Sequence, residues 1–193
     1  MIAEFAKKIN ETLLEKGIVQ TEDAELYRYG IENGITVAGN LFASVIFGIA
    51  TGRLGIILVF LLFYATLRSY SGGIHCRSKA GCFFMSLAVL LIPAYTGGFV
   101  MAHVPKAVLI FFGVLVVVTI IILSPVESIN KPLDDAERKY YARVSHCITA
   151  LQVCVLLVLF CMGLWDYFYA GYISLVLVAF FMILGKKSAK HYT

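Results

Sequence analysis

The class of fold is decided by residues 107–123, which read AVLIFFGVLVVVTIIIL and contain no charged side chain. An apolar segment of this kind is typical of a helix that crosses a lipid bilayer, since a span needs about 20 residues. Five further apolar stretches accompany it, at residues 34–52, 54–67, 81–104, 147–165 and 168–185. The pattern predicts an all-α integral membrane protein with about six transmembrane helices.

The composition excludes an ordinary soluble domain. Of the 193 residues, 60% are hydrophobic and only 15% are charged. Soluble proteins average roughly 45–50% apolar and about 25% charged residues. Lipid solvates the excess apolar surface, and helices satisfy the backbone polar groups within it. The net charge of +4 is small and divided among the loops, which argues against nucleic acid as a partner.

Two of the six stretches are irregular. Only 14 uncharged residues separate Arg53 from Arg68, which is about 21 Å of helix against a hydrocarbon core of roughly 30 Å. This second stretch crosses the bilayer only if both arginines extend toward the headgroups or the membrane thins locally. In the third stretch, Pro93 and the pair Gly97-Gly98 predict a kink or an interruption.

The N-terminal residues predict an amphipathic helix, because Ile2, Phe5, Ile9 and Leu13 recur every three or four positions opposite charged residues. Such a helix either lies in the membrane interface or packs on the cytoplasmic end of the bundle. We expect a single domain over 1–193, made of amphipathic N-terminal helices (1–30), a helical bundle (31–185) and a basic cytoplasmic tail (186–193).

The distribution of Lys and Arg predicts the orientation. If the six stretches cross the membrane alternately, the side that holds both termini carries 14 of the 16 Lys and Arg residues. The other side holds only Arg53 and Lys106. Since cytoplasmic loops are enriched in Lys and Arg, we expect both termini in the cytoplasm and a multi-pass protein of the inner membrane.

The segment most suited to chemistry is residues 68–82, which read RSYSGGIHCRSKAGC between the second and third stretches. A nucleophilic cysteine needs a base, or a positive environment that favours its thiolate. His75 would supply the base for Cys82. The N-terminus of the third span and nearby cations would supply the positive potential, the cations being Arg68, Arg77 and Lys79. Gly72 and Gly73 would permit a positive φ or the close approach of a bound peptide.

Geometry restricts this interpretation. In one continuous helix, His75 and Cys82 would lie about 10.5 Å apart along the axis, so the pair requires a break between them, which Gly81 would permit. Three alternatives remain open: a solvated basic loop with an incidental His and Cys, Cys76 as the nucleophile, and a zinc site. A site built from His75, Cys76 and Cys82 lacks a clear fourth ligand, and we expect neither a metal nor a cofactor.

Other polar or sulfur-containing residues receive simpler interpretations. Cys147, Cys154 and Cys161 repeat every seven positions on one helical stripe. This stripe favours packing in the core or in a homodimer, and we expect a homodimer. The polar groups expected on the same membrane face as His75 could orient its imidazole, as a third group does in other triads; these are Glu127, Asn130, Asp134 and Asp135.

Taken together, these residues resemble a known family. Arg68-x-x-x-Gly72-Gly73-x-His75, followed by six residues and Cys82, is similar to the motif of the accessory gene regulator protein B family. The resemblance extends to the length, the amphipathic N-terminus and the six apolar segments. It also includes a later stretch, with Ser124-Pro125-Val126 followed by Asn130-Lys131-Pro132-Leu133.

This resemblance implies a membrane cysteine endopeptidase of bacterial quorum sensing. Members of the family remove the C-terminal tail of a short pro-peptide, hold the remainder as a thioester and transfer it to a side chain of the same peptide. The product is a thiolactone or lactone ring. By this resemblance Cys82 is the nucleophile and His75 the base and acid, at the cytoplasmic face. Arg68, Gly72 and Gly73 support the site or bind substrate, and the partners are the pro-peptide and membrane lipid.

Two other classes of function fit the composition. A small transporter or channel would keep its flux after Cys82→Ser, but such proteins use paired intramembrane charges, which this sequence lacks. A non-catalytic membrane scaffold would be indifferent to His75→Ala.

Overall fold

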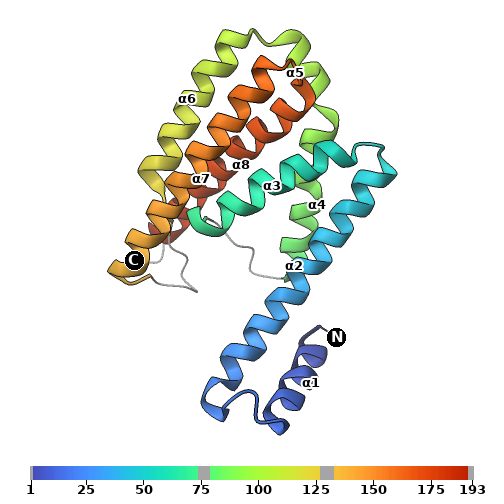
Figure 1. Ribbon diagram of the computed structural model, residues 1–193, viewed down its shortest axis with the longest axis vertical. Helices are drawn as coiled ribbons and strands as arrows, with labels where there is room; N and C mark the ends of the chain where they lie inside the picture. Colours follow the sequence, from blue (N-terminus) through green and yellow to red (C-terminus); the bar gives the residue numbers. More distant parts are fainter. Residues whose placement is uncertain (1, 74–78, 127–132, 191–193) are drawn as a thin grey trace.

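The computed structural model describes residues 2–73, 79–126 and 133–190, which form eight α-helices and one short 3-10 helix (Figure 1). The prediction of an all-α protein is confirmed for these residues. In chain order the elements are α1 (Ile2–Glu15), η1 (Thr21–Asp23), α2 (Ala24–Ala50), α3 (Leu54–Ser71), α4 (Lys79–Tyr95), α5 (Gly97–His103), α6 (Lys106–Leu123), α7 (Asp135–Cys161) and α8 (Trp165–Lys190).

Five helices among the described residues are long and apolar enough to cross a membrane, namely α2 with η1, α3, α6, α7 and α8. The helices α4 and α5 pass the same test together, although they are bent by 44° where they meet, and the number is six if this pair is one span. The prediction of about six spans is therefore confirmed. The helix α3 is longer than the apolar stretch 54–67 suggested. It has 18 residues, or about 27 Å of helix, and includes Arg68.

The predicted interruption of the third span lies at Thr96. Pro93 is buried within α4 and has no N–H to donate, so the helical hydrogen-bond pattern is weakened one turn before the break. The Thr96 hydroxyl donates to the Ile92 carbonyl at 2.7 Å, which satisfies one of the carbonyls at the end of α4. The chain then continues as the short helix α5.

The helix α8 is the centre of the bundle and contacts α3, α4, α5, α6 and α7 (Figure 1). Two apolar clusters meet on it. One joins α3, α6, α7 and α8 around Phe63 and Tyr172, and the other joins α2, α3, α4 and α8 around Phe60 and Leu90. Because α3 contributes to both clusters, its position and rotation are set from two sides.

The helix α1 packs against α2 on the side away from the rest of the bundle (Figure 1). Asn10 donates a hydrogen bond to the Ala24 carbonyl at 2.9 Å, and Ala6 is buried in the contact. Phe5 remains 58% exposed, so part of the apolar stripe of α1 is uncovered. The helix α2 continues without interruption past residue 30, where we expected the N-terminal helices to end.

The fifth span differs from its prediction. The helix α7 begins at Asp135 and ends at Cys161, whereas the apolar stretch had suggested 147–165. Its start is stabilised by a capping box, because Asp134 Oδ1 accepts from the Glu137 amide at 2.6 Å and Glu137 Oε2 accepts from the Asp134 amide at 3.3 Å. Its end is a turn at Gly163, where φ is 71°.

Successive spans run in opposite directions, so the helix ends lie at two opposite ends of the bundle. The end of α3, the start of α4, the end of α6, the start of α7 and the end of α8 lie at one end of the bundle (Figure 1). At the opposite end, Arg53 lies 5.7 Å from the ring centroid of Tyr95, and Lys106 lies 4.0 Å from that of Trp165. Aromatic rings of this kind are enriched at membrane interfaces, where they also attract cations.

Candidate active site

The last turn of α3 holds Arg68 in a fixed position. Its guanidinium donates one hydrogen bond to the Gly72 carbonyl and another to the hydroxyl of Tyr64, one turn earlier on the same helix. The guanidinium carbon also lies 5.8 Å from the ring centroid of Phe181 on α8. Tyr64 is itself held between two rings, since it stacks on Phe60 at 5.4 Å and meets Phe181 edge-on at 6.5 Å. The cation therefore has contacts on three sides.

The two glycines after α3 are required by their surroundings. Gly72 has a φ of 74° and Gly73 a φ of 128°, in a region that favours glycine. A Cβ atom at Gly72 would overlap the carbonyl oxygen of Val126, and a Cβ atom at Gly73 would overlap the Arg68 guanidinium. The latter would also lie 3.1 Å from the Phe181 carbonyl oxygen. The Gly-Gly pair thus allows three segments of the chain to approach one another closely.

The third of these segments is the chain that follows α6. Val126 lies beside Gly72 in a parallel bridge, and its amide donates to the Ser71 carbonyl at 2.9 Å. This contact joins the Ser124-Pro125-Val126 stretch to the end of α3. Residues 127–132, which include Glu127 and Asn130, lie outside the described residues.

Cys82 lies in the first turn of α4 and is partly buried. Electrostatic interactions link it to both Arg68 and Tyr64. A helix N-terminus and a nearby cation each favour the thiolate form of a cysteine. Of the two groups, only the Arg68 cation favours a Cys82 thiolate, together with the helix N-terminus, because Tyr64 would itself become anionic on ionisation.

Gly81 does not provide the break that we expected between His75 and Cys82. It lies within α4, which begins at Lys79. His75 and Cys76 belong to residues 74–78, which are outside the described part of the chain. Arg68, Gly72, Gly73 and Cys82 are thus positioned by the structure, and the position of His75 remains a prediction.

A protein-family model described as accessory gene regulator B matches residues 3–183. This match includes the helices from α2 to α7, most of α8 and the whole of the segment 68–82. The chain belongs to the accessory gene regulator B family. Processing of quorum-sensing peptides is the activity associated with this family. No curated protein and no solved structure matches the chain.

The sequence alone did not place three residues at this candidate site, although one of them, Val126, belongs to the Ser124-Pro125-Val126 stretch that resembles the family. Tyr64 precedes Arg68 by four positions, so helical spacing could have indicated it. Phe181 and Val126 carry no sequence signal for their contacts with Arg68 and Gly72, because they reach the site only when α8 and the chain after α6 pack against α3.

The three cysteines of α7 are not part of this candidate site. Cys147, Cys154 and Cys161 are exposed along α7, so packing in the core of one chain, one of the two roles expected for this stripe, is wrong. Packing in a homodimer stays a prediction. Among the residues that the structure describes, no group of three His, Cys, Asp or Glu side chains could hold a metal ion.

Proposed function

We propose that this chain is a membrane-embedded cysteine endopeptidase that cuts a short quorum-sensing pro-peptide and closes the remainder into a ring. The observation that supports this most is the contact network that holds Arg68 beside Gly73 and in electrostatic interaction with Cys82. A fixed cation that interacts electrostatically with a thiol at a helix N-terminus stabilises the anions that acyl transfer generates.

In the proposed first step, His75 takes the proton of the Cys82 thiol, and the thiolate attacks the carbonyl carbon at the cleavage site. The tetrahedral oxyanion then collapses and the C–N bond breaks. His75 returns the proton to the departing amine of the tail, and the rest of the peptide stays on Cys82 as a thioester. Arg68 stabilises the negative charge of the thiolate and of the oxyanion.

The second step closes the ring. A thiol or hydroxyl of the bound peptide attacks the thioester carbonyl and gives its proton to His75. The S–C bond to Cys82 breaks, which releases a thiolactone or lactone, and the proton from His75 restores the thiol. A thioester suits this transfer because it stays reactive toward another nucleophile. The bound peptide presents that nucleophile at a high effective concentration, at a lipid boundary that limits water.

We place this reaction at the cytoplasmic face. If the six spans cross alternately, the side of the membrane that carries Cys82 and Arg68 also carries the segments that hold 14 of the 16 Lys and Arg residues, which favours the cytoplasmic side. Both termini then lie in the cytoplasm, and the membrane is the bacterial inner membrane. The proposed partners are the pro-peptide, membrane lipid and a second copy of the chain.

The decisive experiment is co-expression with the pro-peptide, with the products read by mass spectrometry. Cys82→Ser should abolish release of the tail while the protein stays in the membrane, because a serine hydroxyl is a far weaker nucleophile than a stabilised thiolate. Cys154→Ser, on the exposed face of α7, is the matched control and should cleave normally. Near wild-type cleavage by Cys82→Ser would exclude the mechanism.

Further variants separate the roles within the pair. His75→Ala should lose cleavage to the same degree as Cys82→Ser, and the double variant should be no worse, since nucleophile and base act as one unit. Cys76→Ser should keep most of the activity; if instead it is inactive and Cys82→Ser is active, Cys76 is the nucleophile. A pro-peptide that lacks its ring-forming side chain should accumulate as a thioester on Cys82.

A further inference from the structure

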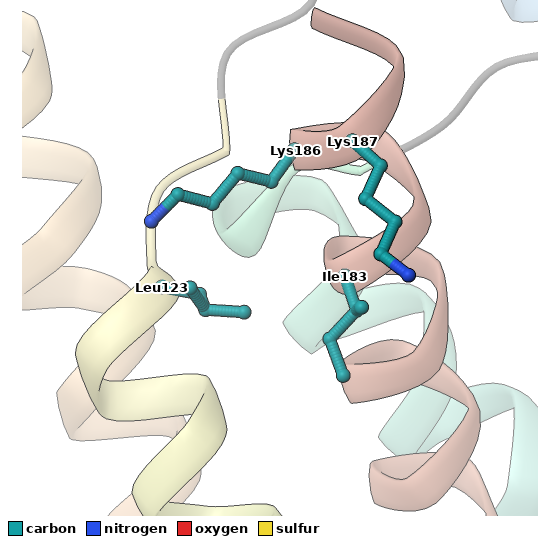
Figure 2. Close-up of a pocket in the computed structure, with 4 residues that line it drawn as sticks. All are labelled: Leu123, Ile183, Lys186 and Lys187. Carbon is teal, nitrogen blue, oxygen red and sulfur yellow. The ribbon is translucent and has the colours of Figure 1, made fainter. Parts of the chain in front are cut away.

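A groove of about 260 Å³ opens between the ends of α6 and α8, at the same end of the bundle as the candidate active site (Figure 2). Leu123, Ile183, Lys186 and Lys187 line it. Figure 2 shows the Lys186 side chain reaching across toward the end of α6, while the Lys187 side chain descends along α8 beside Ile183. The groove thus combines an apolar floor with two lysine side chains, whose ammonium groups point to opposite sides in Figure 2.

The groove lies where side chains of the central helix α8 become exposed. Between positions 168 and 185 of α8, the only exposed side chains are Phe180 and Ile183, which are 51% and 40% exposed. These positions are three residues apart, and Lys186 and Lys187 follow Ile183 at the next three and four positions. Such spacing puts all four on one face of the helix. On that face an apolar strip leads directly to two cations, about 9–10 Å beyond Phe180.

The neighbouring surface of α6 is also apolar and open. Ile121 and Ile122 are 46% and 72% exposed next to Leu123. Both walls of the groove therefore continue into surface that faces the hydrocarbon of the membrane, and the cations stand where that surface ends. No ion pair joins Lys186 or Lys187 to an acidic residue in the described part of the chain.

We propose that this groove binds one anionic phospholipid, with an acyl chain along Ile183 and Phe180 and a phosphate toward which the flexible side chains of Lys186 and Lys187 turn on binding. The positive charge of Lys186 and Lys187 favours an anionic ligand. The apolar surface of Leu123 and Ile183 favours a ligand that carries a hydrocarbon chain. A free phosphate ion would use the lysines but gain nothing from Leu123 and Ile183. A lipid without net charge would use the floor but have little attraction to the lysines.

The site adjoins the elements that hold Arg68. Leu123 directly precedes the Ser124–Val126 stretch, which pairs with Ser71 and Gly72. Phe181, two residues before Ile183, lies over the Arg68 guanidinium. A lipid in the groove would therefore contact both α6 and α8 close to the candidate active site. We expect bound lipid to raise the thermal stability of the full chain.

The test is a titration of the full-length protein in detergent with phosphatidylglycerol, followed by native mass spectrometry. Near an anionic membrane each lysine contributes roughly 1 kcal/mol, so Lys186→Gln/Lys187→Gln should weaken binding about 30-fold. Lys7→Gln/Lys8→Gln removes the same charge from α1 and should leave binding unchanged. Lys186→Arg/Lys187→Arg keeps the charge and should also bind normally.

Several outcomes would overturn the proposal. Equal binding by the Gln variant and the wild type would exclude the two lysines, and loss of binding in the Arg variant would show that charge at these two positions is not what matters. Equal affinity for phosphatidylcholine would exclude selection by headgroup charge. Displacement by glycerol phosphate at similar concentration would show a site for the headgroup alone. A change in oligomeric state instead of lipid binding would assign the groove to a second copy of the chain.

Discussion

The Arg68 guanidinium lies against the backbone of Gly73 so closely that a Cβ atom at position 73 would overlap it. The same guanidinium donates to the carbonyl of the preceding glycine, Gly72. The cation and the start of the chain that leads to His75 are therefore held together as one unit, at the end of α3. Three of the following predictions each change one residue of this unit or its support, namely Gly73, Arg68 or Tyr64.

The first prediction concerns Gly73. Gly73→Ala forces the Arg68 guanidinium to move and places a side chain at a φ of 128°, a strained conformation for any residue with a Cβ atom. We expect the initial rate of tail release to fall by roughly 100-fold, since a displacement of about 1 Å at a reacting site has effects of this size. The rate is measured in membrane vesicles that contain equal amounts of each protein.

Gly98→Ala is the matched control for this variant. Gly98 lies in α5, and a Cβ atom there would meet nothing within 4 Å, so tail release should be unchanged. Normal cleavage by Gly73→Ala would show that the position of Arg68 is not important for the reaction.

The second prediction separates the charge of Arg68 from its shape. Arg68→Lys keeps the charge, but an ammonium group has no planar fork to donate to Gly72 and Tyr64 while it lies over the Phe181 ring. Loss of one hydrogen bond to a charged group is worth about 1.5–3 kcal/mol, so we expect cleavage to be roughly 10- to 100-fold slower.

Arg53→Lys provides the comparison for Arg68→Lys. Arg53 lies over the ring of Tyr95 at the opposite end of the bundle, and a lysine there keeps the cation–π contact. Its rate of tail release should equal that of the wild type. If the two variants cleave equally fast, the planar guanidinium of Arg68 is not needed for tail release.

The third prediction tests Tyr64 as a residue that positions Arg68. Tyr64→Phe removes only the hydroxyl that accepts from Arg68, and the ring can keep its contacts with Phe60 and Phe181. We expect kcat for tail release to fall roughly 10-fold while KM for the pro-peptide stays the same. A change in KM alone would assign Tyr64 to substrate binding instead.

The control for Tyr64→Phe is another tyrosine with a single hydroxyl contact. The Tyr169 hydroxyl lies 2.7 Å from the Thr96 hydroxyl, far from Cys82. Tyr169→Phe removes a hydrogen bond of similar kind and should leave both kinetic constants unchanged.

The fourth prediction concerns Asp134, one of the four polar residues that could orient His75. Its carboxylate already accepts from the Glu137 amide as the N-cap of α7. Because asparagine also caps helices, Asp134→Asn should keep both stability and cleavage, whereas Asp134→Ala should lower the free energy of unfolding by about 1 kcal/mol. Slow cleavage by the Asn variant with unchanged stability would instead show that the carboxylate orients the imidazole.

The fifth prediction concerns the orientation in the membrane. Asp135 in the first turn of α7 and Asp166 in the first turn of α8 are both exposed, and α7 separates them across the bundle. In a background without native cysteines, an impermeant thiol reagent added outside cells should label Asp166→Cys and not Asp135→Cys. The opposite pattern would put the candidate active site on the outer face.

The sequence was sufficient to predict the number of spans, because the bilayer requires long apolar helices whose length can be counted. It also predicted the interruption after Pro93, since the missing N–H is a property of that residue alone. It did not predict that α3 reaches Ser71 or that α7 begins at Asp135. Both extensions consist largely of polar residues, for which the apolar pattern carries no signal.

For the candidate site, the sequence determined which groups are present: a cation, a flexible glycine pair and a thiol, all within residues 68–82. Only the tertiary structure decided that Phe181 covers Arg68 and that Val126 lies beside Gly72. These contacts depend on how α8 and α6 are rotated about their axes. In spans that are apolar on every face, periodicity does not reveal that rotation; close packing between the helices sets it instead.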